Sequence, residues 1–470
     1  MQYIIIFFSV FALLIIHKAC LAQSLGSVKQ APTEVTGLSR KDIDGEKRNL
    51  IEHAITDVQP QDFLSSSETI SELVNQKIDV GALINKAFKS GISRVRIPCG
   101  NYLITTTIQM SGLQTLMGDG MCTALYSTIV GDDVIDVSGA FNTIRDIRIN
   151  NMVTKTGGNV VFAHKTFHLV IDHIDIDAVN THTYWWNGIV LYGANDTHIN
   201  DSEMRPAGKN AAIQLSGTQK TGRSEDTYIT HTNINGWKYA LELSWASGNY
   251  LSNMDLLSAT EFGVIFDPES WQEVDGTRAS QILSDSNTKD GWRFDGVGAI
   301  TETSLTNCWG STNGYQQGSS QIVALADGLH VVNPNTDNLT VLASEFHSNT
   351  AHGIEIDSGQ NILISSNTIF MNGIGGQAKM LDTSAYKPNS YSGIFIHKPV
   401  SYISVTNNIG GLGGVRNASA INHQKYLVNT ESGNYVTISL NIGNHHWGES
   451  VVNANGAVGK NIILNNNNGN

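Results

Sequence analysis

The stretch Gly263-Val264-Ile265-Phe266 carries the pattern that decides the fold: a small residue, an apolar residue, any residue and a second apolar residue. The pattern returns 28 residues later at Gly291-Trp292-Arg293-Phe294 and 37 residues after that at Gly328-Leu329-His330-Val331. Five more copies are Gly188-Ile189-Val190-Leu191, Ala212-Ile213-Gln214-Leu215, Ala240-Leu241-Glu242-Leu243, Gly353-Ile354-Glu355-Ile356 and Gly393-Ile394-Phe395-Ile396. Neighbouring copies are 23 to 40 residues apart. Repeats of this length, with two or three short strands each, are typical of a parallel β-solenoid.

A helical pattern precedes the first repeats. Apolar residues between Ile70 and Phe88 recur at helical spacing, and the pattern ends at Gly91. A short amphipathic helix is therefore expected here. Because the first strand of a stack otherwise offers an open edge, this helix is expected to cap the solenoid.

Two segments resemble a known superfamily. Ala82 to Phe88 and Val95 to Ile104 are similar to the helix, turn and strand that open many pectate-lyase-like proteins. The likeness continues as a loose repeat over about residues 80 to 440. The resemblance implies an all-β fold, a right-handed parallel β-helix with a short N-terminal capping helix. It also implies a protein that cuts or modifies acidic polysaccharides. The Gly-His-Gly and Arg-x-Lys motifs of polygalacturonases and a recognisable pectate-lyase calcium motif are missing, so the reaction stays open.

The expected domain organisation has four parts. Residues 1–22 are predicted to be a signal peptide, because the apolar run Tyr3 to Ile16 is followed by the small residues Cys20 and Ala22. An uncleaved membrane anchor is the alternative. Residues 23–71 are predicted to form a polar arm or linker, residues 72–446 the parallel β-helix, and residues 447–470 a C-terminal tail. The protein is thus expected to be secreted, extracellular or periplasmic.

Composition narrows the range of partners. The chain has 470 residues, 45 of them Gly and 8 Pro, which favours short strands and turns over long helices. Its formal net charge of −13 has the wrong sign for holding nucleic acid by its phosphates or adhering to an anionic membrane. We therefore expect no nucleic acid partner, and no membrane association after signal cleavage.

Three cysteines follow the expected signal peptide: Cys99, Cys122 and Cys308. Their spacing fits no metal motif. In an oxidising compartment Cys99 and Cys122 are candidates for a disulfide, with Cys308 left over. Three buried free thiols are the alternative.

Outward positions of the repeats supply the catalytic candidates. With the apolar positions inside, the residue between them and the residue after them point outward and stack into two ladders, about 4.8 Å per coil. The first ladder reads Val190, Gln214, Glu242, Ile265, Arg293, His330, Glu355 and Phe395; the second reads Tyr192, Ser216, Ser244, Asp267, Asp295, Val332, Asp357 and His397. Asp267 and Asp295 fall on neighbouring coils, and Glu242 lies one diagonal step from Asp267. Carboxyl groups this close raise one another's pKa, as a general acid requires.

Cationic and aromatic residues near these acids are predicted to bind substrate. Seven of the eight tryptophans lie between residues 185 and 309. Flat rings in loops stack on sugar faces while their N–H groups stay hydrated. The predicted substrate-binding residues are Arg293, His330, Trp185, Trp186, Trp245 and Trp271, whereas Trp292 is expected in the core.

Three functions remain open at this stage. The first is a secreted glycoside hydrolase that uses Glu242, Asp267 and Asp295. The second is a polysaccharide lyase or epimerase whose base is Arg293, His330 or Lys209. The third is a non-catalytic glycan-binding or adhesive solenoid. No metal or other cofactor is expected for the hydrolase, whereas a lyase would take calcium. Either a monomer or a homotrimer fits the sequence.

Overall fold

The computed structural model describes residues 58–453, except 66, 181, 206–207, 316–320, 374–390, 398–399, 412–423, 432–433 and 445–451, together with four short outlying strands. The chain divides into two compact units, Met1–Asp57 and Val58–Asn470. In the first unit, β1 (Ser39–Lys41) and β2 (Lys47–Asn49) pair antiparallel. The predicted signal peptide, residues 1–22, lies outside the described residues.

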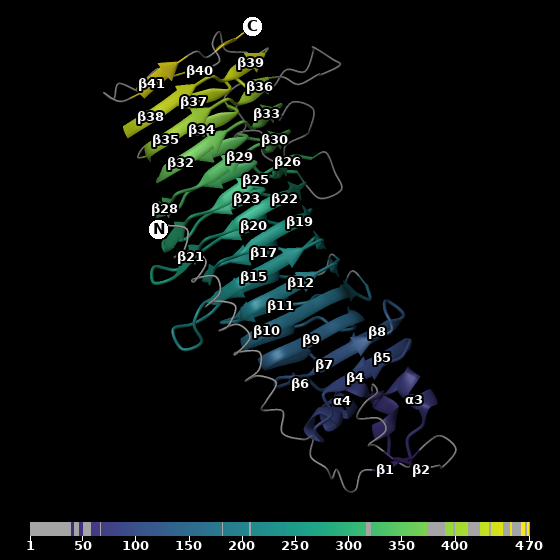
Figure 1. The fold of residues 1–470 in the computed structure, drawn as a ribbon. Coiled ribbons are helices and arrows are strands. Elements are labelled where there is room, and N and C mark those ends of the chain that lie inside the picture. Colours follow the sequence, from purple (N-terminus) through teal and green to yellow (C-terminus); the bar gives the residue numbers. More distant parts are fainter. Residues whose placement is uncertain are drawn as a thin grey trace, which may run out of the picture. The chain divides into compact units, whose positions relative to one another are not determined.

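The second unit is a solenoid in which each coil contributes strands to three parallel sheets (Figure 1). The first sheet carries the repeat pattern and comprises β6 (Ile108–Met110), β11 (Asn187–Tyr192), β14 (Ala211–Ser216), β17 (Tyr239–Leu243), β20 (Phe262–Phe266), β23 (Trp292–Phe294), β27 (Leu329–Val331), β31 (Ile354–Ile356), β34 (Ile394–Ile396), β37 (Val428–Thr430) and β40 (Val452–Asn453). Two long strands, β9 (Ile135–Asn151) and β10 (Asn159–Ala178), run through all three sheets.

The other two sheets are built in the same way. The second sheet comprises β4 (Arg94–Ile97), β7 (Thr115–Gly118), β12 (Asn195–Asn200), β15 (Ser224–Thr230), β25 (Ser304–Thr306), β29 (Thr340–Leu342), β32 (Gly359–Ser365), β35 (Val400–Thr406), β38 (Asn434–Ser439) and β41 (Ile462–Asn465). The third comprises β5 (Gly100–Ile104), β8 (Thr123–Ser127), β13 (Glu203–Met204), β16 (Asn233–Asn235), β26 (Trp309–Ser311), β30 (Glu345–His347), β33 (Thr368–Phe370), β36 (Ile409–Gly411), β39 (Ile442–Asn444) and β42 (Asn468–Gly469). Strands β19 (Tyr250–Leu257) and β22 (Arg278–Asp285) bend from the second sheet into the third, and β18 (Ala246–Ser247), β21 (Glu273–Asp275), β24 (Ala299–Thr301) and β28 (Thr336–Asp337) connect the first sheet to the second.

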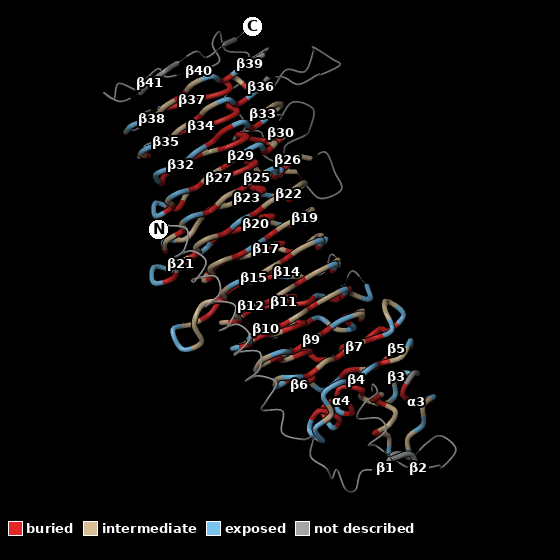
Figure 2. The backbone as a smooth tube through the Cα atoms, in the orientation of Figure 1, coloured by how far each residue is buried: buried red, intermediate tan, exposed pale blue. Residues whose placement is uncertain are grey.

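The core is a column of stacked apolar side chains inside the coils. Figure 2 colours the backbone of buried residues red along the coils. The first apolar position of the repeat stays fully buried from coil to coil, as at Leu241, Val264 and Trp292. At the second position, the rings of Phe266 and Phe294 stack with centroids 4.4 Å apart. Burying each such side chain contributes about 2 kcal/mol relative to exposure. The predicted all-β, right-handed parallel β-helix is confirmed.

The N-terminal cap differs in detail from the prediction. The helical pattern is split into α3 (Ile70–Val74) and α4 (Val80–Lys89) by the strand β3 (Asn75–Asp79), because β3 pairs with β5 of the first coil. The carboxylate of Asp79 accepts a bond from the Gly81 amide, which starts α4. In α4, Asn85 donates to the carbonyl of Thr107 and accepts from the amide of Gln109. The helix therefore covers the edge of the first coil, as predicted.

The compact unit begins before the expected boundary at residues 71 and 72. Val58 bridges to Val95, and the short 3-10 helix η1 (Pro60–Phe63) packs against α4. The segment after residue 57 thus belongs to the solenoid unit and is not part of a free arm.

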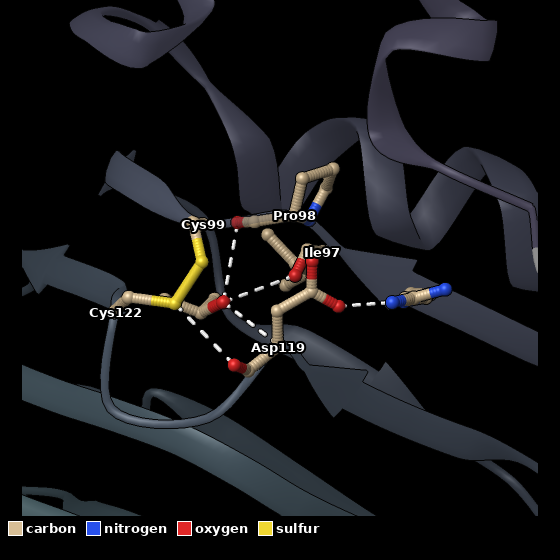
Figure 3. Close-up of a disulfide and its surroundings, with 7 residues drawn as sticks. Ile97, Pro98, Cys99, Asp119 and Cys122 are labelled. Atoms are coloured by element: carbon tan, nitrogen blue, oxygen red, sulfur yellow. Dashed lines mark hydrogen bonds and ion pairs between the residues drawn. A yellow bond between two sulfur atoms is a disulfide. The ribbon is translucent and has the colours of Figure 1, made fainter.

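The disulfide pairing is the first of the two alternatives. Cys99 is bonded to Cys122 (Figure 3). Buried Cys308 is free. Beside the bridge, the Thr123 hydroxyl bonds to the carbonyls of Ile97 and Pro98 at 3.1 and 3.2 Å. The bridge therefore reinforces the junction between β5 and β8. Burial raises the pKa of the Cys308 thiol to about 11, so this thiol is unreactive at neutral pH.

Candidate active site

The outward ladder of the first sheet has the predicted register. Gln214 pairs with Glu242, Glu242 with Ile265, and Ile265 with Arg293. The series continues through His330, Glu355 and Phe395. Side chains that are distant in sequence therefore lie on one outer face, about 4.8 Å apart per coil.

A cleft of about 450 Å³ opens on this face. Three carboxylate residues line it: Glu242 and Asp267, which were predicted as catalytic, and Glu269. The remaining lining residues are Tyr192, Gln214, Ser216, Gly217, Thr218, Ser244, Pro268, Trp271, Gln272, Gly296 and Val297. The cleft thus combines acids, neutral hydrogen-bonding groups and the aromatic rings of Tyr192 and Trp271.

Glu242 is held in β17 between two coils. Its carboxyl group accepts a 3.0 Å hydrogen bond from the side-chain amide of Gln214 on the preceding coil. Burial raises the pKa of Glu242 to about 7, and the charge of Asp267 adds to this effect. The hydrogen bond from Gln214 and the charge of Lys238 oppose it. A substantial fraction of this carboxyl group is therefore protonated at neutral pH.

Asp267 follows directly after β20, and its amide donates to the carbonyl of Leu243 at 2.9 Å. This bond places it one coil and two residues from Glu242, about 8 Å along the backbone diagonal. Partial burial raises the pKa of Asp267, and the charges of Asp295 and Glu269 add to the shift. The two carboxyl groups thus face one cleft, and the charge of Asp267 helps to raise the pKa of Glu242.

Asp295 lies beside this pair but does not line the cleft. One of its carboxylate oxygens pairs with the Arg293 guanidinium at 3.0 Å, and the other accepts from the Gly296 amide at 2.9 Å. Asp295 therefore acts on Asp267 through its charge, while its own oxygens are engaged.

The tryptophans divide between the core and the surface. Trp271 lines the cleft, with 42% of its surface exposed. Its ring meets that of Trp245 edge to face at 4.9 Å, and its N–H donates to Glu269 at 2.8 Å. Trp186 is half-buried near Lys209, outside the cleft. The prediction for Trp185 is wrong: the ring is fully buried, and its N–H bonds to the Asp177 carbonyl at 2.8 Å.

Arg293 and His330 belong to a second group on the same face, which we call the acid–histidine cluster. Its members are Asp290, Arg293, Asp327, His330, Glu355, Asp357 and His397. Arg293 pairs with Asp290 at 3.0 Å. His330 pairs through its two ring nitrogens with Asp327 at 3.2 Å and with Asp357 at 3.0 Å. The structure therefore places both predicted substrate-binding cations against acids of this chain, outside the cleft lining.

Protonation in the acid–histidine cluster follows from this pairing. Burial alone would lower the pKa of His330, but the bonds to Asp290 and Asp357 raise it to about 11. Burial and the neighbouring charge of Glu355 raise the pKa of Asp327 well above its usual range. The pKa of Glu355 is held low despite burial, because His397 and His352 stabilise its charge. Burial and these bonds thus favour the charged forms of His330 and Glu355 and the neutral form of Asp327, while the Arg293 guanidinium also lies 2.7 Å from Nδ1 of His330.

Two sets in this cluster bring potential metal-binding atoms within 4.8 Å of one another: Asp290, Asp327 and His330, and His330, Glu355 and Asp357. A divalent cation there would have to displace the proton of His330 and compete with Arg293 for Asp290. In the cluster as it stands, Arg293 and His330 already pair with its carboxyl groups.

Sequence reasoning missed Asp290 and Asp327. Each immediately precedes the glycine of a repeat, as does His352 on the following coil. These three positions form a further column, which the pattern of small and apolar residues left out. A comparison of the residue before each repeat would have found it.

Comparisons with known proteins agree with this architecture. No family model and no curated protein matches the sequence. Among solved structures, bacteriophage CBA120 tailspike protein 3 superposes with a TM-score of 0.61 at 13% identity, covering 95% of this chain and 66% of that one. The chain has the right-handed parallel β-helix fold. The Dettilon tailspike protein shares this fold, with a TM-score of 0.55 at 13% identity, covering 81% of this chain and 69% of that one.

A further match is the Azotobacter vinelandii mannuronan C-5 epimerase AlgE6 A-module, at a TM-score of 0.49 and 11% identity, covering 88% of this chain and 99% of that one. This chain spans about two-thirds of the length of each tailspike. At these identities the likeness concerns the fold alone.

Proposed function

We propose that this protein is a secreted polysaccharide-degrading enzyme, a glycoside hydrolase with Glu242 as general acid and Asp267 as base or nucleophile. One observation carries the proposal. A carboxyl group with a pKa raised to about 7 faces the same cleft as a second carboxyl group and an exposed tryptophan ring. Glycoside hydrolysis requires one carboxyl group that gives a proton and another that is ionised.

The steps balance without a cofactor. Glu242 donates its proton to the glycosidic oxygen as the bond to the anomeric carbon breaks. Asp267 either takes a proton from the attacking water or bonds to the anomeric carbon, and water then releases the sugar. One water molecule is consumed in both cases. If Asp267 is the nucleophile, Glu242 regains its proton from the water that releases the sugar; if Asp267 is the base, proton exchange with solvent returns both carboxyl groups to their starting states before the next turnover. The anomeric form of the first product distinguishes the two routes.

The lyase or epimerase alternative is less well supported. It requires a base that is free to take a proton from the sugar ring. His330 has a pKa raised to about 11 and is paired with acids, and Arg293 is bound by Asp290 and Asp295. Lys209 lies near the rings of Tyr184 and Trp186, at 6.0 and 5.8 Å, outside the cleft lining. Only a test for cleavage products distinguishes the non-catalytic, adhesive alternative from the hydrolase.

The setting of the enzyme completes the proposal. We propose cleavage of residues 1–22 and action in an extracellular or periplasmic compartment, which the Cys99–Cys122 bridge supports. In the part of the chain that the structure describes, no helix combines the length and apolar character of a membrane span. Light scattering of the purified protein separates the monomer from the homotrimer.

The proposal is tested by substitution of the cleft acids. Wild-type protein, Glu242→Gln and Asp267→Asn are incubated with a panel of polysaccharides, and reducing ends and ultraviolet absorbance are followed together. We expect new reducing ends without absorbance from the wild type, and none from the two variants. Asp255→Asn is the matched control, because Asp255 is an exposed carboxylate on the third sheet. Equal activity in all four proteins, or absorbance rising with reducing ends, would contradict the proposal.

A further inference from the structure

The charges of the cleft are all of one sign. Among its described lining residues, the ionisable acids are Glu242, Asp267 and Glu269, and none of the others is Lys, Arg or His. Asp295 adds a fourth carboxylate near Asp267. A negatively charged ligand group therefore meets acids on entering this space.

The neighbouring cations are engaged by acids of this chain. Arg293 is held by Asp290 and Asp295, each at 3.0 Å. Lys238 lies 3.9 Å from Glu261 and 4.7 Å from the centre of the Tyr239 ring. Arg223 pairs with Glu225 at 2.8 Å and with Glu273 at 3.6 Å. Neutralising a ligand carboxylate would require breaking one of these pairs.

The uncharged groups of the cleft match sugar hydroxyls. Gln214, which lines the cleft, uses its amide nitrogen on Glu242 and keeps its amide oxygen as an acceptor. The hydroxyls of Ser216 and Ser244 bond to each other at 2.8 Å, and each retains capacity for a further bond. Such uncharged groups bind neutral polar ligands through hydrogen bonds.

The aromatic platform is fixed before a ligand arrives. Glu269 accepts from the N–H of Trp271, and Trp245 packs against the ring. The Glu269 amide in turn donates to the side chain of Gln272 at 2.8 Å. Trp271 is thus oriented from several sides while keeping exposed surface for stacking on the apolar face of a sugar.

From this arrangement we infer that the cleft takes a stretch of uncharged sugar residues and excludes uronates, so the substrate class is a neutral polysaccharide. The inference deepens the proposed function and rests on it in assigning the cleft to a glycan. It departs from the acidic polysaccharides that the fold resemblance implies.

The test compares each polymer with its own neutral twin. Polygalacturonate and alginate are paired with their carboxyl-reduced derivatives, and neutral glucans, mannans and galactans complete the panel. Binding is measured by retardation of the full mature protein in gels that contain each polymer, and cleavage by release of reducing ends. We expect at least tenfold stronger retardation by one or more neutral polymers than by either polyuronate, and cleavage confined to neutral polymers.

A substitution of Glu269 provides a second test of the inference. Glu269→Gln removes one cleft carboxylate and retains an acceptor for the N–H of Trp271. We expect it to weaken the exclusion of polyuronates several-fold, whereas Asp255→Asn, which changes the net charge equally on another sheet, leaves the exclusion unchanged. An equal effect of both variants would show that net charge alone acts, and would overturn the inference.

The outcomes separate the inference from the proposed function. Retardation by a polyuronate as strong as by its neutral twin overturns the inference. Cleavage of a polyuronate that Glu242→Gln abolishes also overturns the inference but leaves the hydrolase standing. If no polymer of the panel is bound or cut, both fail together.

Discussion

The cleft and the acid–histidine cluster lie on the same outer sheet face and are both rich in acids, yet they differ in how those acids are paired. In the cleft, Glu242 has a neutral amide as its hydrogen-bond partner, and its pKa is raised to about 7. In the cluster, His330 contacts acids through both ring nitrogens, and Arg293 binds two further carboxylates. Glu242, with its neutral partner, exchanges its proton near neutral pH, whereas Asp290, Asp295 and Asp357 are held in ion pairs with Arg293 and His330. Pairing, more than the number of acids, separates the proposed catalytic site from a structural one.

The largest effects are expected from one substitution in the cleft and one in the acid–histidine cluster. Glu242→Gln should reduce kcat by about 10²- to 10⁴-fold, the usual contribution of a general acid, because Gln has no proton to give. Its melting temperature should stay at or above that of the wild type. Reducing-end release and thermal unfolding measured on the same preparation check both parts, and a melting temperature lowered in step with activity would count against a catalytic role.

His330→Gln should have the opposite effect to Glu242→Gln: it should lower stability and change activity little. Removing the imidazolium leaves the buried carboxylate of Asp290 and the carboxylate of Asp357 without one of their charge partners, which costs about 3–5 kcal/mol. Urea unfolding measures the loss, and activity per folded molecule should change little. If activity disappears while stability is retained, the cluster belongs to the catalytic machinery.

The stability contributed by His330 should also depend on pH. The pKa of His330 in the folded protein, about 11, lies above its ordinary value of 6.5, so the folded state binds this proton more tightly. The contribution is therefore complete below about pH 6.5 and is lost as the pH rises through 11. The alkaline decline in melting temperature should be smaller in His330→Gln than in the wild type. Parallel declines would show that His330 is not the group responsible.

The smallest expected effect concerns the sugar platform. Trp271→Ala should raise KM about fivefold with a smaller change in kcat, because a lost stacking contact is worth about 1 kcal/mol. Trp309→Ala is the matched control, since Trp309 is 41% exposed against 42% for Trp271 but lies on the third sheet. Equal changes in KM for the two variants would argue against a specific platform.

The fold and the ladder register followed from the sequence because the repeat places two apolar residues inside every coil. Once one strand of the first sheet is assigned, its pairing with the next coils fixes which side chains point outward. Glu242 and Asp267 could therefore be placed on one surface. Asp290 and Asp327 escaped prediction because they precede the repeat, where the chain turns into the strand and strict alternation no longer applies. Trp185 was misplaced because a residue between strands carries no periodic signal. In the structure its ring packs inward near buried Lys155.

The most direct test of this account is a pH titration of Glu242 by infrared difference spectroscopy between the wild type and Glu242→Gln. This measurement needs no substrate and reports the protonated carboxyl group itself. We expect a carboxylic acid band that is absent from the variant and that disappears, as the pH rises, with a midpoint near pH 7. A midpoint at or below the ordinary glutamate value of about 4.3 would contradict it, because the cleft would then hold no acid ready to protonate a glycosidic bond.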